Sequence, residues 1–481
     1  MPWKAVSPIE IYKLLPRTNC QKCGEENCMA FAAKLVNMEI RLEKCTPLIE
    51  DLTYKDSYGK IWALVKPPVR LVTAKRGSKS VNIGGEYVTY RHEMTYVNPP
   101  PIAIDVDDEM SEEEIVNRVK LVDGFTFNYV GMDLRLDMVA VRSVSDDPER
   151  YRGALKLVLE NSRAPVILCS FNPKVIDAGL RMLEGEKPVI YAATVRNWEE
   201  MSDLALKYGC PLAIYSPGDV DAMASMTKTL LERGVGDLLL DPGTFVGEGF
   251  VETMGSFVAL RWKACEGGDE LSGFPVIGVP LTAWLTVPGD PDEKARWEAV
   301  TAASLIIRHA SLLVMHSIEG WSLLPLVMLR QNIYTDPRKP IAVKPGLRII
   351  GNPDAWSPIF VTGNFVLTYY LVSGDIESAK IDSYLLVADS EGMAIDAAVA
   401  GKKLTSDKIA EALKGSELEK KVEHRILVIP GKSARLSGET EDVTKWKVVV
   451  GPSECSEIPS FVKDKWPAIL EEWKKEQAGS G

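Results

Sequence analysis

The sequence predicts an α/β protein of several domains, and three observations carry this prediction. The chain has 481 residues, 46% of them hydrophobic and 26% charged, which is ordinary for a soluble globular protein and enough for two to four domains. Short apolar runs alternate with helical stretches from about residue 100 to about residue 320. Four of the eight cysteines lie close together near the N-terminus, whereas the other four are scattered.

The predicted division has four parts. A small cysteine-rich domain comes first and a β-rich connector follows it. A (β/α)8 barrel of the TIM type comes third, and a smaller doubly wound, Rossmann-like sheet comes last. The expected ranges are 1–60 for the cysteine-rich domain, 61–98 for the connector, 99–322 for the barrel and 323–481 for the C-terminal sheet domain.

The N-terminal cysteines have the spacing C-x2-C-x4-C-x16-C, which predicts a metal site. Three clustered thiolates, a distant fourth and a proline soon after it suit a [4Fe-4S] cluster, which takes one thiolate per iron. A four-cysteine zinc site is the alternative, although zinc ligands usually come as two C-x2-C pairs. The expected ligands are Cys20, Cys23, Cys28 and Cys45, and the expected small buried hydrophobes are Cys169, Cys210, Cys265 and Cys455.

Local signals place the first elements. Ser7 followed by Pro8 predicts a capped helix, and residues 29–36 form a second, amphipathic one. So small a domain buries little apolar surface, so we expect bound metal to supply much of its stability. In the connector we expect strands at 69–73 and 87–90.

Eight short apolar runs predict the strands of the barrel. They lie at 102–104, 138–141, 166–168, 189–192, 212–215, 238–240, 276–279 and 312–315. Polar residues follow several of them, at the end where a barrel carries its functional face: Asp105, Ser170, Asn172, Thr194, Ser216, Asp241 and His316. Because such residues also cap helices, and no cluster of histidine and carboxylates names a reaction, we interpret them mainly as structural.

The C-terminal part predicts a sheet whose strands each end in a turn of small residues. The strands are 359–361, 384–388, 426–429 and 447–450, and an amphipathic helix closes the chain after about residue 452. Doubly wound sheets bind ligands beyond the carboxyl ends of their strands, and glycine or serine turns let a large ligand approach closely. Residues 430–433 read Pro-Gly-Lys-Ser, but Ile426 stands where a nucleotide-binding P-loop needs glycine.

Composition excludes several classes of function. The net charge of −11 argues against a nucleic-acid surface, which needs a basic face. No run of about 18 apolar residues predicts a membrane span, and the first residues lack the apolar core of a signal peptide. We therefore expect a cytoplasmic protein with reduced cysteines.

This combination of parts resembles that of a known family, the large subunit of the corrinoid iron-sulfur protein. The resemblance extends over essentially the full length of the chain. In methanogens this family is the gamma subunit of the acetyl-CoA decarbonylase/synthase complex. Residues 15–20 and 45–47 look like its cluster-binding segment, and residues 361–365 with 368–370 look like its corrinoid turn. The resemblance implies a methyltransferase component. Its cobalt(I) accepts a methyl group from methyl-tetrahydropterin (tetrahydrosarcinapterin or tetrahydromethanopterin) and passes it to the nickel site of acetyl-CoA synthase.

The resemblance also implies cofactors and partners. The [4Fe-4S] cluster would return cobalt(II) to cobalt(I), and the corrinoid would be a cobamide in the base-off form. The implied partners are a smaller delta subunit whose barrel covers the corrinoid, the acetyl-CoA synthase subunit, and methyl-tetrahydropterin, which we expect on the partner's barrel. The lower base, the net direction of the reaction and the size of the assembly do not follow from the sequence.

The resemblance further implies the corrinoid contacts. Residues beneath cobalt would be Thr362, Gly363, Asn364 and Phe365; residues around the nucleotide tail and corrin amides would be Gly392, Gly431, Ser433, Ala434, Leu436, Ser437 and Gly438; Tyr334 and Pro340 would add contacts where the domain begins. The alternative roles are ordinary ones: Thr362 as a helix N-cap, and the rest as turns and caps.

The histidines allow one check on this interpretation. Proteins that ligate cobalt through histidine carry Asp-x-His-x-x-Gly, and none of His92, His309, His316 and His424 lies in that pattern. Without an imidazole ligand cobalt is easier to reduce, and a low-potential cluster could then supply the electron that returns cobalt(II) to cobalt(I). The competing hypothesis is an iron-sulfur electron-transfer or scaffold subunit without corrinoid. A radical enzyme is disfavoured, because it needs a C-x3-C-x2-C triad with one open iron.

Overall fold

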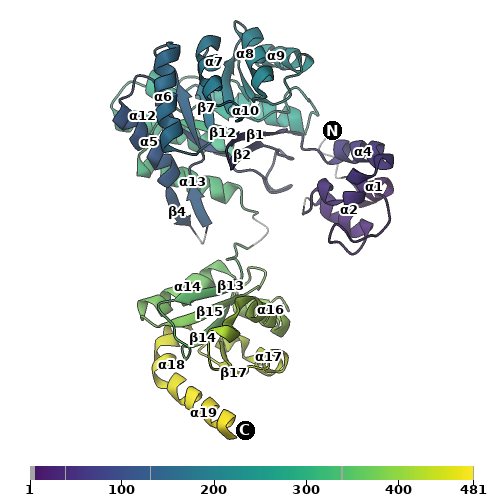
Figure 1. Cartoon of the computed structure of the whole chain (residues 1–481), viewed down its shortest axis with the longest axis vertical. Helices are drawn as coiled ribbons and strands as arrows, with labels where there is room; N and C mark the ends of the chain where they lie inside the picture. Colours follow the sequence, from purple (N-terminus) through teal and green to yellow (C-terminus); the bar gives the residue numbers. More distant parts are fainter. Residues whose placement is uncertain (1–5, 38, 130–131, 337–339, 480–481) are drawn as a thin grey trace. The chain divides into compact units, whose positions relative to one another are not determined.

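The computed structural model describes residues 6–37, 39–129, 132–336 and 340–479, which belong to two compact units (Figure 1). The first unit comprises residues 1–129 and 133–335, and the second comprises 130–132 and 336–481. The first five residues, on which the argument against a signal peptide partly depends, lie outside the described residues. Among the described residues, no helix has both the length and the apolar character needed to cross a membrane.

Short helices form the cysteine-rich domain. Their bounds are Pro8–Leu14 (α1), Cys28–Val36 (α2), Thr46–Glu50 (α3) and Lys55–Val65 (α4). The predicted start of the first helix is confirmed: the Ser7 hydroxyl accepts from the N–H of Ile9, and Glu10 completes a capping box. A small core of Ile11, Phe31, Leu48 and Ile61 holds the helices together.

The connector forms a hairpin, but not the one predicted. Strand β1 (Leu71–Arg76) pairs with β2 (Lys79–Gly84) across a turn at Gly77, which has a φ of +56°. The predicted strand at 87–90 is wrong. The ladder ends at Gly84, because Gly84 and Gly85 both adopt positive φ and turn the chain away from the sheet.

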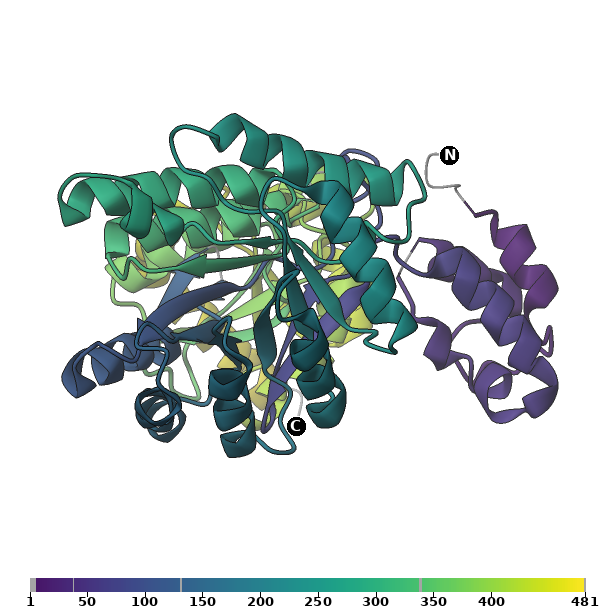
Figure 2. The ribbon, with the colours of Figure 1, turned by 90° about the horizontal axis from the view of Figure 1, so that it is seen from above.

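All eight predicted barrel strands are present. They are β3 (Ile102–Asp107), β6 (Met138–Arg142), β7 (Val166–Cys169), β8 (Val189–Ala193), β9 (Leu212–Tyr215), β10 (Leu238–Asp241), β11 (Ile277–Gly278) and β12 (Leu312–Met315). They are parallel, in the order β10-β9-β8-β7-β6-β3-β12-β11, and a bridge between Leu240 and Val276 joins the two edges. Figure 2 shows these strands with helices arranged around them.

The helices of the barrel lie outside the strands, as a (β/α)8 barrel requires. Their bounds are Glu112–Gly124 (α5), Pro148–Asn161 (α6), Pro173–Met182 (α7), Trp198–Tyr208 (α8), Val220–Glu232 (α9), Phe250–Cys265 (α10), Thr282–Thr286 (α11), Pro291–Ile307 (α12) and Gly320–Ile333 (α13). A hairpin that the sequence analysis missed, β4 (Thr126–Tyr129) with β5 (Met132–Arg135), lies between α5 and β6.

The first unit extends to Thr335, beyond the predicted barrel boundary at 322. The reason is α13, whose apolar residues Leu323, Leu326 and Val327 pack into the core between strands and outer helices. The four-part division itself stays a prediction.

The amino end of the barrel is closed by the β1–β2 hairpin. Val72, Ala74 and Ile83 pack on inward-facing strand residues such as Met138 and Ile167. The backbone of Lys75 also bonds to that of Lys187, just before β8. Access to the barrel interior is therefore from the carboxyl ends of the strands.

The second unit is a five-stranded sheet in the order β13-β15-β14-β16-β17. Its strands are Gly346–Ile350 (β13), Ile359–Gly363 (β14), Ser383–Ala388 (β15), Ile426–Ile429 (β16) and Lys447–Val450 (β17); its helices are Val366–Ser378 (α14), Ile395–Ala400 (α15), Ser406–Ser416 (α16), Ser437–Thr444 (α17), Ile458–Asp464 (α18) and Trp466–Gly479 (α19). The four predicted strands are present and mutually parallel, whereas β13 is an antiparallel edge strand that the sequence analysis missed.

Helices cover both faces of this sheet. Alternate residues of β14 separate the two layers, because Val361 packs toward α15 and α16 and Phe360 packs toward α14 and α18. The carboxyl ends of the parallel strands consequently share one edge, where the predicted small-residue turns lie.

Candidate metal centre and cofactor pocket

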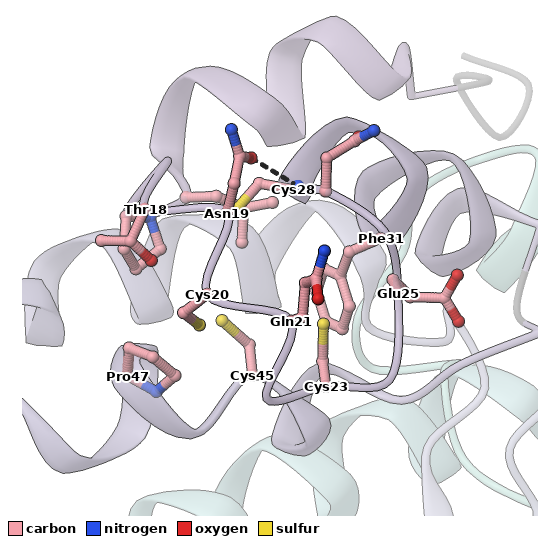
Figure 3. Close-up of a pocket in the computed structure, with 13 residues that line it drawn as sticks. Thr18, Asn19, Cys20, Gln21, Cys23, Glu25, Cys28, Phe31, Cys45 and Pro47 are labelled. Carbon is pink, nitrogen blue, oxygen red and sulfur yellow. Dashed lines mark hydrogen bonds between the residues drawn. The ribbon is translucent and has the colours of Figure 1, made fainter.

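The four N-terminal cysteines border a single cavity (Figure 3). Cys20 and Cys23 lie on the loop between α1 and α2, Cys28 is the first residue of α2, and Cys45 directly precedes α3. The side chains of Cys20, Cys23 and Cys45 point toward the same space in Figure 3. The fold thus brings together the ligands that their spacing predicts.

Left-handed backbone conformations shape the cysteine loop. Arg17, Asn19 and Gln21 have φ values of 56°, 46° and 58°, and Gly24 has 86°. Alternating conformations of this kind form concave nests of N–H groups, which occur at many iron–sulfur sites. The Asn19 side chain accepts from the N–H of Cys28 at 2.9 Å and so ties the loop to the start of α2.

The electrostatics of the site show that the thiols are close together. A hydrogen bond from the backbone N–H of Lys22 lowers the pKa of the exposed Cys20, and the Thr18 hydroxyl adds to this effect. Burial raises the pKa of Cys45, and the other three cysteine thiolates raise it further through repulsion. A bound cationic metal would relieve that repulsion and favour the thiolates.

The donor set fits an iron–sulfur cluster. The cavity holds about 340 Å³ of empty space, part of it open to solvent, and its walls include the apolar Leu15 and Phe31. Four thiolates match the one ligand per iron that a [4Fe-4S] cluster needs. Within the described ranges, no three His, Cys, Asp or Glu side chains converge as the ligands of one metal ion do.

A second cavity, of about 800 Å³ and open to solvent, lies at the carboxyl edge of the C-terminal sheet. Its walls come from β14, β16, α14 and the turns after β16 and β17. The lining residues include Phe360, Thr362, Thr368, Leu371, Ala394, Asp396, Val428, Pro430, Lys432, Gly451, Ser453 and Cys455. Of the predicted cofactor contacts, Thr362 is the one that lines this cavity.

Thr362 is the clearest sign of a ligand at this edge. Its side chain is 1% exposed, and its hydroxyl has no hydrogen-bond partner among the described residues. A buried hydroxyl without a partner costs about 1–3 kcal/mol, so a group bound in the cavity would stabilise it. Its alternative role as the N-cap of α14 is not observed, because Phe365 holds the cap position.

Asn364 joins the turn after β14 to the turn after β15. Its side-chain oxygen accepts from the N–H of Ser390 and the N–H of Gly392, both at 2.9 Å. Its amide donates to Asp389, also at 2.9 Å. The predicted residues Gly363, Asn364 and Gly392 are therefore brought together.

Close packing at these turns explains two glycines. A Cβ on Gly363 would lie 2.8 Å from the Ser390 hydroxyl, and one on Gly392 would lie 2.9 Å from the Pro340 carbonyl oxygen. Gly392 also has a φ of +70°. Pro340, a predicted contact, thus lies beside the same turn.

The remaining predicted contacts lie in two other places. Gly431, Ser433, Ala434 and Leu436 belong to a 3-10 helix after β16, and Ser437 and Gly438 begin α17. The Ser433 hydroxyl is occupied by the Pro430 carbonyl at 2.8 Å, as in an ordinary turn. Tyr334 belongs to the first unit, where its ring packs 5.4 Å from that of Tyr96 and burial raises its pKa.

Sequence reasoning missed several lining residues of the second cavity. Leu371 lies in the second turn of α14, and Ser453 and Cys455 follow β17. The glycine–proline–serine turn after β17 was visible in the sequence and was the available signal. Leu371 had no signal beyond its place after the predicted corrinoid turn, which already included Thr368.

The one histidine of the second unit does not face this cavity. His424 precedes β16 and therefore lies at the opposite, amino edge of the sheet. Its side chain is buried, with Nε2 2.9 Å from the Ser357 carbonyl oxygen and Nδ1 accepting from Ile426 at 3.2 Å. Both ring nitrogens are thus used in the fold.

The carboxyl end of the barrel holds a polar layer that the sequence analysis interpreted as mainly structural. Asp105, Asp241 and His316 follow the inward alternation of their strands, together with Arg142 and Tyr191. By contrast, Asn172 caps α7, and the Ser216 hydroxyl bonds to the carbonyl of Asp219, which caps α9. The interpretation as structural residues therefore holds for Asn172 and Ser216. It did not anticipate that Asp105, Asp241 and His316 all face the interior of the barrel.

Fold and site together define a multidomain α/β protein that joins an eight-stranded parallel barrel to a cysteine-lined N-terminal site. A family model described as the CO dehydrogenase/acetyl-CoA synthase delta subunit matches residues 71–462. A second, described as a proposed Fe–S cluster, matches residues 15–47. The chain belongs to the first of these families.

Similar proteins with curated names are called gamma subunits. Acetyl-CoA decarbonylase/synthase complex subunit gamma 1 of Methanosarcina mazei is 41% identical over 467 residues, covering 96% of this chain and 99% of the relative. The gamma subunit of Methanothermobacter thermautotrophicus is 40% identical over 457 residues, covering 95% and 98%. Dihydropteroate synthase from Thermus thermophilus, a solved structure, covers 55% of this chain and 100% of its own, with a TM-score of 0.39 at 14% identity.

Proposed function

We propose that the protein is a corrinoid methyl carrier, the methyltransferase component of an acetyl-CoA decarbonylase/synthase complex. One observation carries the proposal: a single chain holds both a four-cysteine cavity and a large cavity at the carboxyl edge of a parallel sheet, with the unpartnered Thr362 hydroxyl in its wall. Relatives about 40% identical, named as gamma subunits of that complex, support the assignment.

In this proposal Cys20, Cys23, Cys28 and Cys45 hold a [4Fe-4S] cluster. The four cysteines around one cavity, the left-handed loop and the match to a proposed Fe–S segment support this ligand set. A cluster held in this way supplies electrons at low potential. Zinc is the alternative occupant, and it supplies none.

We propose that the second unit is a Rossmann-like domain that binds a base-off cobamide at its carboxyl edge. Thr362, Gly363, Asn364 and Phe365 would face the metal, and Gly392 and the 431–438 segment would approach the periphery. A bound corrinoid supplies a cobalt nucleophile for methyl groups. The engagement of both His424 nitrogens at the other edge argues against a histidine ligand to cobalt, because no imidazole of this unit is free to ligate.

The proposal includes partners and compartment. The methyl donor would be methyl-tetrahydropterin, and the methyl acceptor the nickel site of the acetyl-CoA synthase subunit. A smaller delta subunit would complete the corrinoid site. The setting would be the cytoplasm, where thiols stay reduced.

Elemental analysis and a visible spectrum of protein purified without air test this proposal. We expect about four irons with matching sulfide, and about one cobalt, per chain. Corrinoid bands should be superimposed on the broad cluster absorption. Iron without cobalt would favour the electron-transfer or scaffold alternative, and zinc without sulfide would overturn the cluster.

A matched pair of variants locates the corrinoid. Asn364→Ala should lower the cobalt content of the protein and leave its iron content unchanged, because the side chain links the turns after β14 and β15 of the second unit. Asn352→Ala, whose site is an exposed turn, is the control. Equal cobalt in both variants would count against the proposed corrinoid position.

A further inference from the structure

The mouth of the barrel has two facing walls. His316 follows β12, and its ring lies 4.5 Å from that of Trp284. Four strands away in the ring, and so across an eight-stranded barrel, Tyr191 on β8 forms an aromatic group with Tyr215 and Phe171. Phe171 is 52% exposed, so this group reaches solvent. Aromatic walls of this kind suit a planar ring.

An aspartate–histidine pair occupies the first of these walls. Asp105 is completely buried, and its Oδ1 lies 2.6 Å from Nδ1 of His316. The backbone N–H of His316 donates to Glu298, which also accepts from the Trp284 indole at 3.0 Å. With Nδ1 turned to the carboxylate, Nε2 lies on the opposite edge of the ring, and it has no partner among the described residues. The side chain is 20% exposed.

The charges around His316 are balanced in the protein itself. Arg118 bonds to Asp105 at 3.1 Å and to the His316 carbonyl, and its guanidinium lies 3.4 Å from Nδ1 of the His316 ring. Arg142 bonds to Asp105 at 3.2 Å and to Asp107 at 2.7 Å. Glu298 faces the backbone of His316 rather than its ring. The carboxylate of Asp105 is therefore shared with two arginines that fix its position, and it in turn fixes the imidazole.

We propose that His316, oriented by Asp105, donates a proton to the nitrogen that loses its methyl group in the methyl transfer; this rests on the proposed function. The N–CH3 bond breaks, its electron pair stays on nitrogen and takes the proton of Nε2, and the methyl group leaves as a methyl cation equivalent, for which the proposed reduced corrinoid would supply the accepting electron pair. A nitrogen anion is a poor leaving group, so a general acid is needed. Asp105 is then a positioning residue. The reduced, planar N-methyl heterocycle binds in this chain's barrel rather than only in the partner's.

Kinetics test the acid in the complete complex. His316→Gln should slow single-turnover methyl transfer by about 10²- to 10⁴-fold. It should also remove the fall in rate that deprotonation of a general acid causes as pH rises. His309→Asn, at the amino end of the same barrel strand, is the control and should stay within about threefold of the parent. A His316→Gln rate within threefold of the parent, with the pH profile unchanged, would overturn the proposal.

Two measurements on corrinoid-free protein separate this inference from the proposed function. Nitrogen-15 NMR of the parent should show a proton on Nδ1 of His316 hydrogen-bonded to Asp105, and this signal should shift in Asp105→Asn. Methyl-tetrahydromethanopterin should quench tryptophan fluorescence in the parent and in His316→Gln, and not after Phe171→Ala with Tyr215→Ala. Absence of both signals overturns the inference even if the protein binds cobalt. Both signals without any cobalt binding leave the barrel site standing and refute the carrier function.

Discussion

The cysteine site and the barrel mouth are assembled in opposite ways. All four cysteines fall between residues 20 and 45, on one loop and two helix starts. The barrel mouth takes Asp105, Arg142 and His316 from three strands spread over more than 200 residues. Spacing reveals the first kind of site, whereas only the strand order reveals the second.

The two regions also differ in what stabilises them. The cysteine domain has a small apolar core, and we expect a ligand bound by its thiolates to add to its stability. The barrel mouth neutralises its own buried charges through ion pairs and lies above a large apolar core. Substitutions should therefore affect the first through metal content and the second through folding free energy.

The largest expected effect is the loss of the cluster. Cys28→Ala should remove most of the iron and abolish electron-driven reactivation of the protein, because three thiolates leave one iron without its ligand. Methyl transfer to protein whose cobalt has already been reduced should continue. Cys210→Ala, in the barrel, is the control, and iron analysis with reactivation assays gives the answer. Equal loss of both activities would contradict a purely reductive role.

Removing the central carboxylate of the barrel mouth should have the next largest effect. Asp105→Ala leaves the buried Arg118 without its carboxylate and Arg142 with Asp107 alone, which should lower the free energy of unfolding by about 3–5 kcal/mol. Asp133→Ala, at an exposed pair, should change it by less than about 1 kcal/mol. Urea unfolding of the two variants measures the difference. Similar values would mean that the network contributes little.

Asp241, a buried acid in the same polar layer, should make the stability of the protein depend on pH. Burial raises the pKa of Asp241 from 3.8 to about 6, against hydrogen bonds from Tyr191 and Gly243. The folded state holds this proton more tightly, so the stabilisation is complete below pH 3.8 and is lost as pH rises through 6. Between pH 4 and pH 7 the parent should lose about 2 kcal/mol relative to Asp241→Asn. Parallel stability curves would contradict this pKa.

The smallest expected effect concerns the turns at the carboxyl edge of the C-terminal sheet. The residues of these turns are farther apart in sequence than the cysteines and closer together than the residues of the barrel mouth. Asn364→Ala removes the acceptor for the N–H groups of Ser390 and Gly392 and should cost about 1–3 kcal/mol. Asn352→Ala should cost less than about 0.5 kcal/mol, since surface substitutions usually do. Thermal unfolding compares the two, and equal midpoints would show that the link between the turns is dispensable.

Sequence patterns predicted most of the regular structure, because barrel and sheet strands are short apolar runs between helical stretches. Strands β4, β5 and β13 were missed, since β4 and β5 alternate polar and apolar residues over only four positions and Arg348 interrupts the apolar residues of β13. The strand expected at 87–90 was wrong, because the backbone freedom of Gly84 and Gly85 outweighed the alternation of the residues after them.

The candidate sites also differ in whether local sequence patterns predict them. The cysteine ligands followed from spacing, and the clustering of Gly363, Asn364 and Gly392 followed from turn chemistry. The pairing of Asp105 with His316 could not be found this way, because residues 211 positions apart meet only when the barrel closes. Tyr334 lies in the first unit because α13 extends the barrel beyond the expected boundary.

The hairpin at the amino end of the barrel decides how the chain can be divided experimentally. The hairpin covers the amino end of the barrel with the side chains of Val72, Ala74 and Ile83. These residues therefore belong with the barrel, even though they precede its first strand. A shortened chain that starts near residue 67 should keep the β1–β2 hairpin and fold without the cysteine domain. A shortened chain that starts near residue 98 would lack the hairpin, so the apolar core at the amino end of the barrel would be exposed to water and the protein should aggregate.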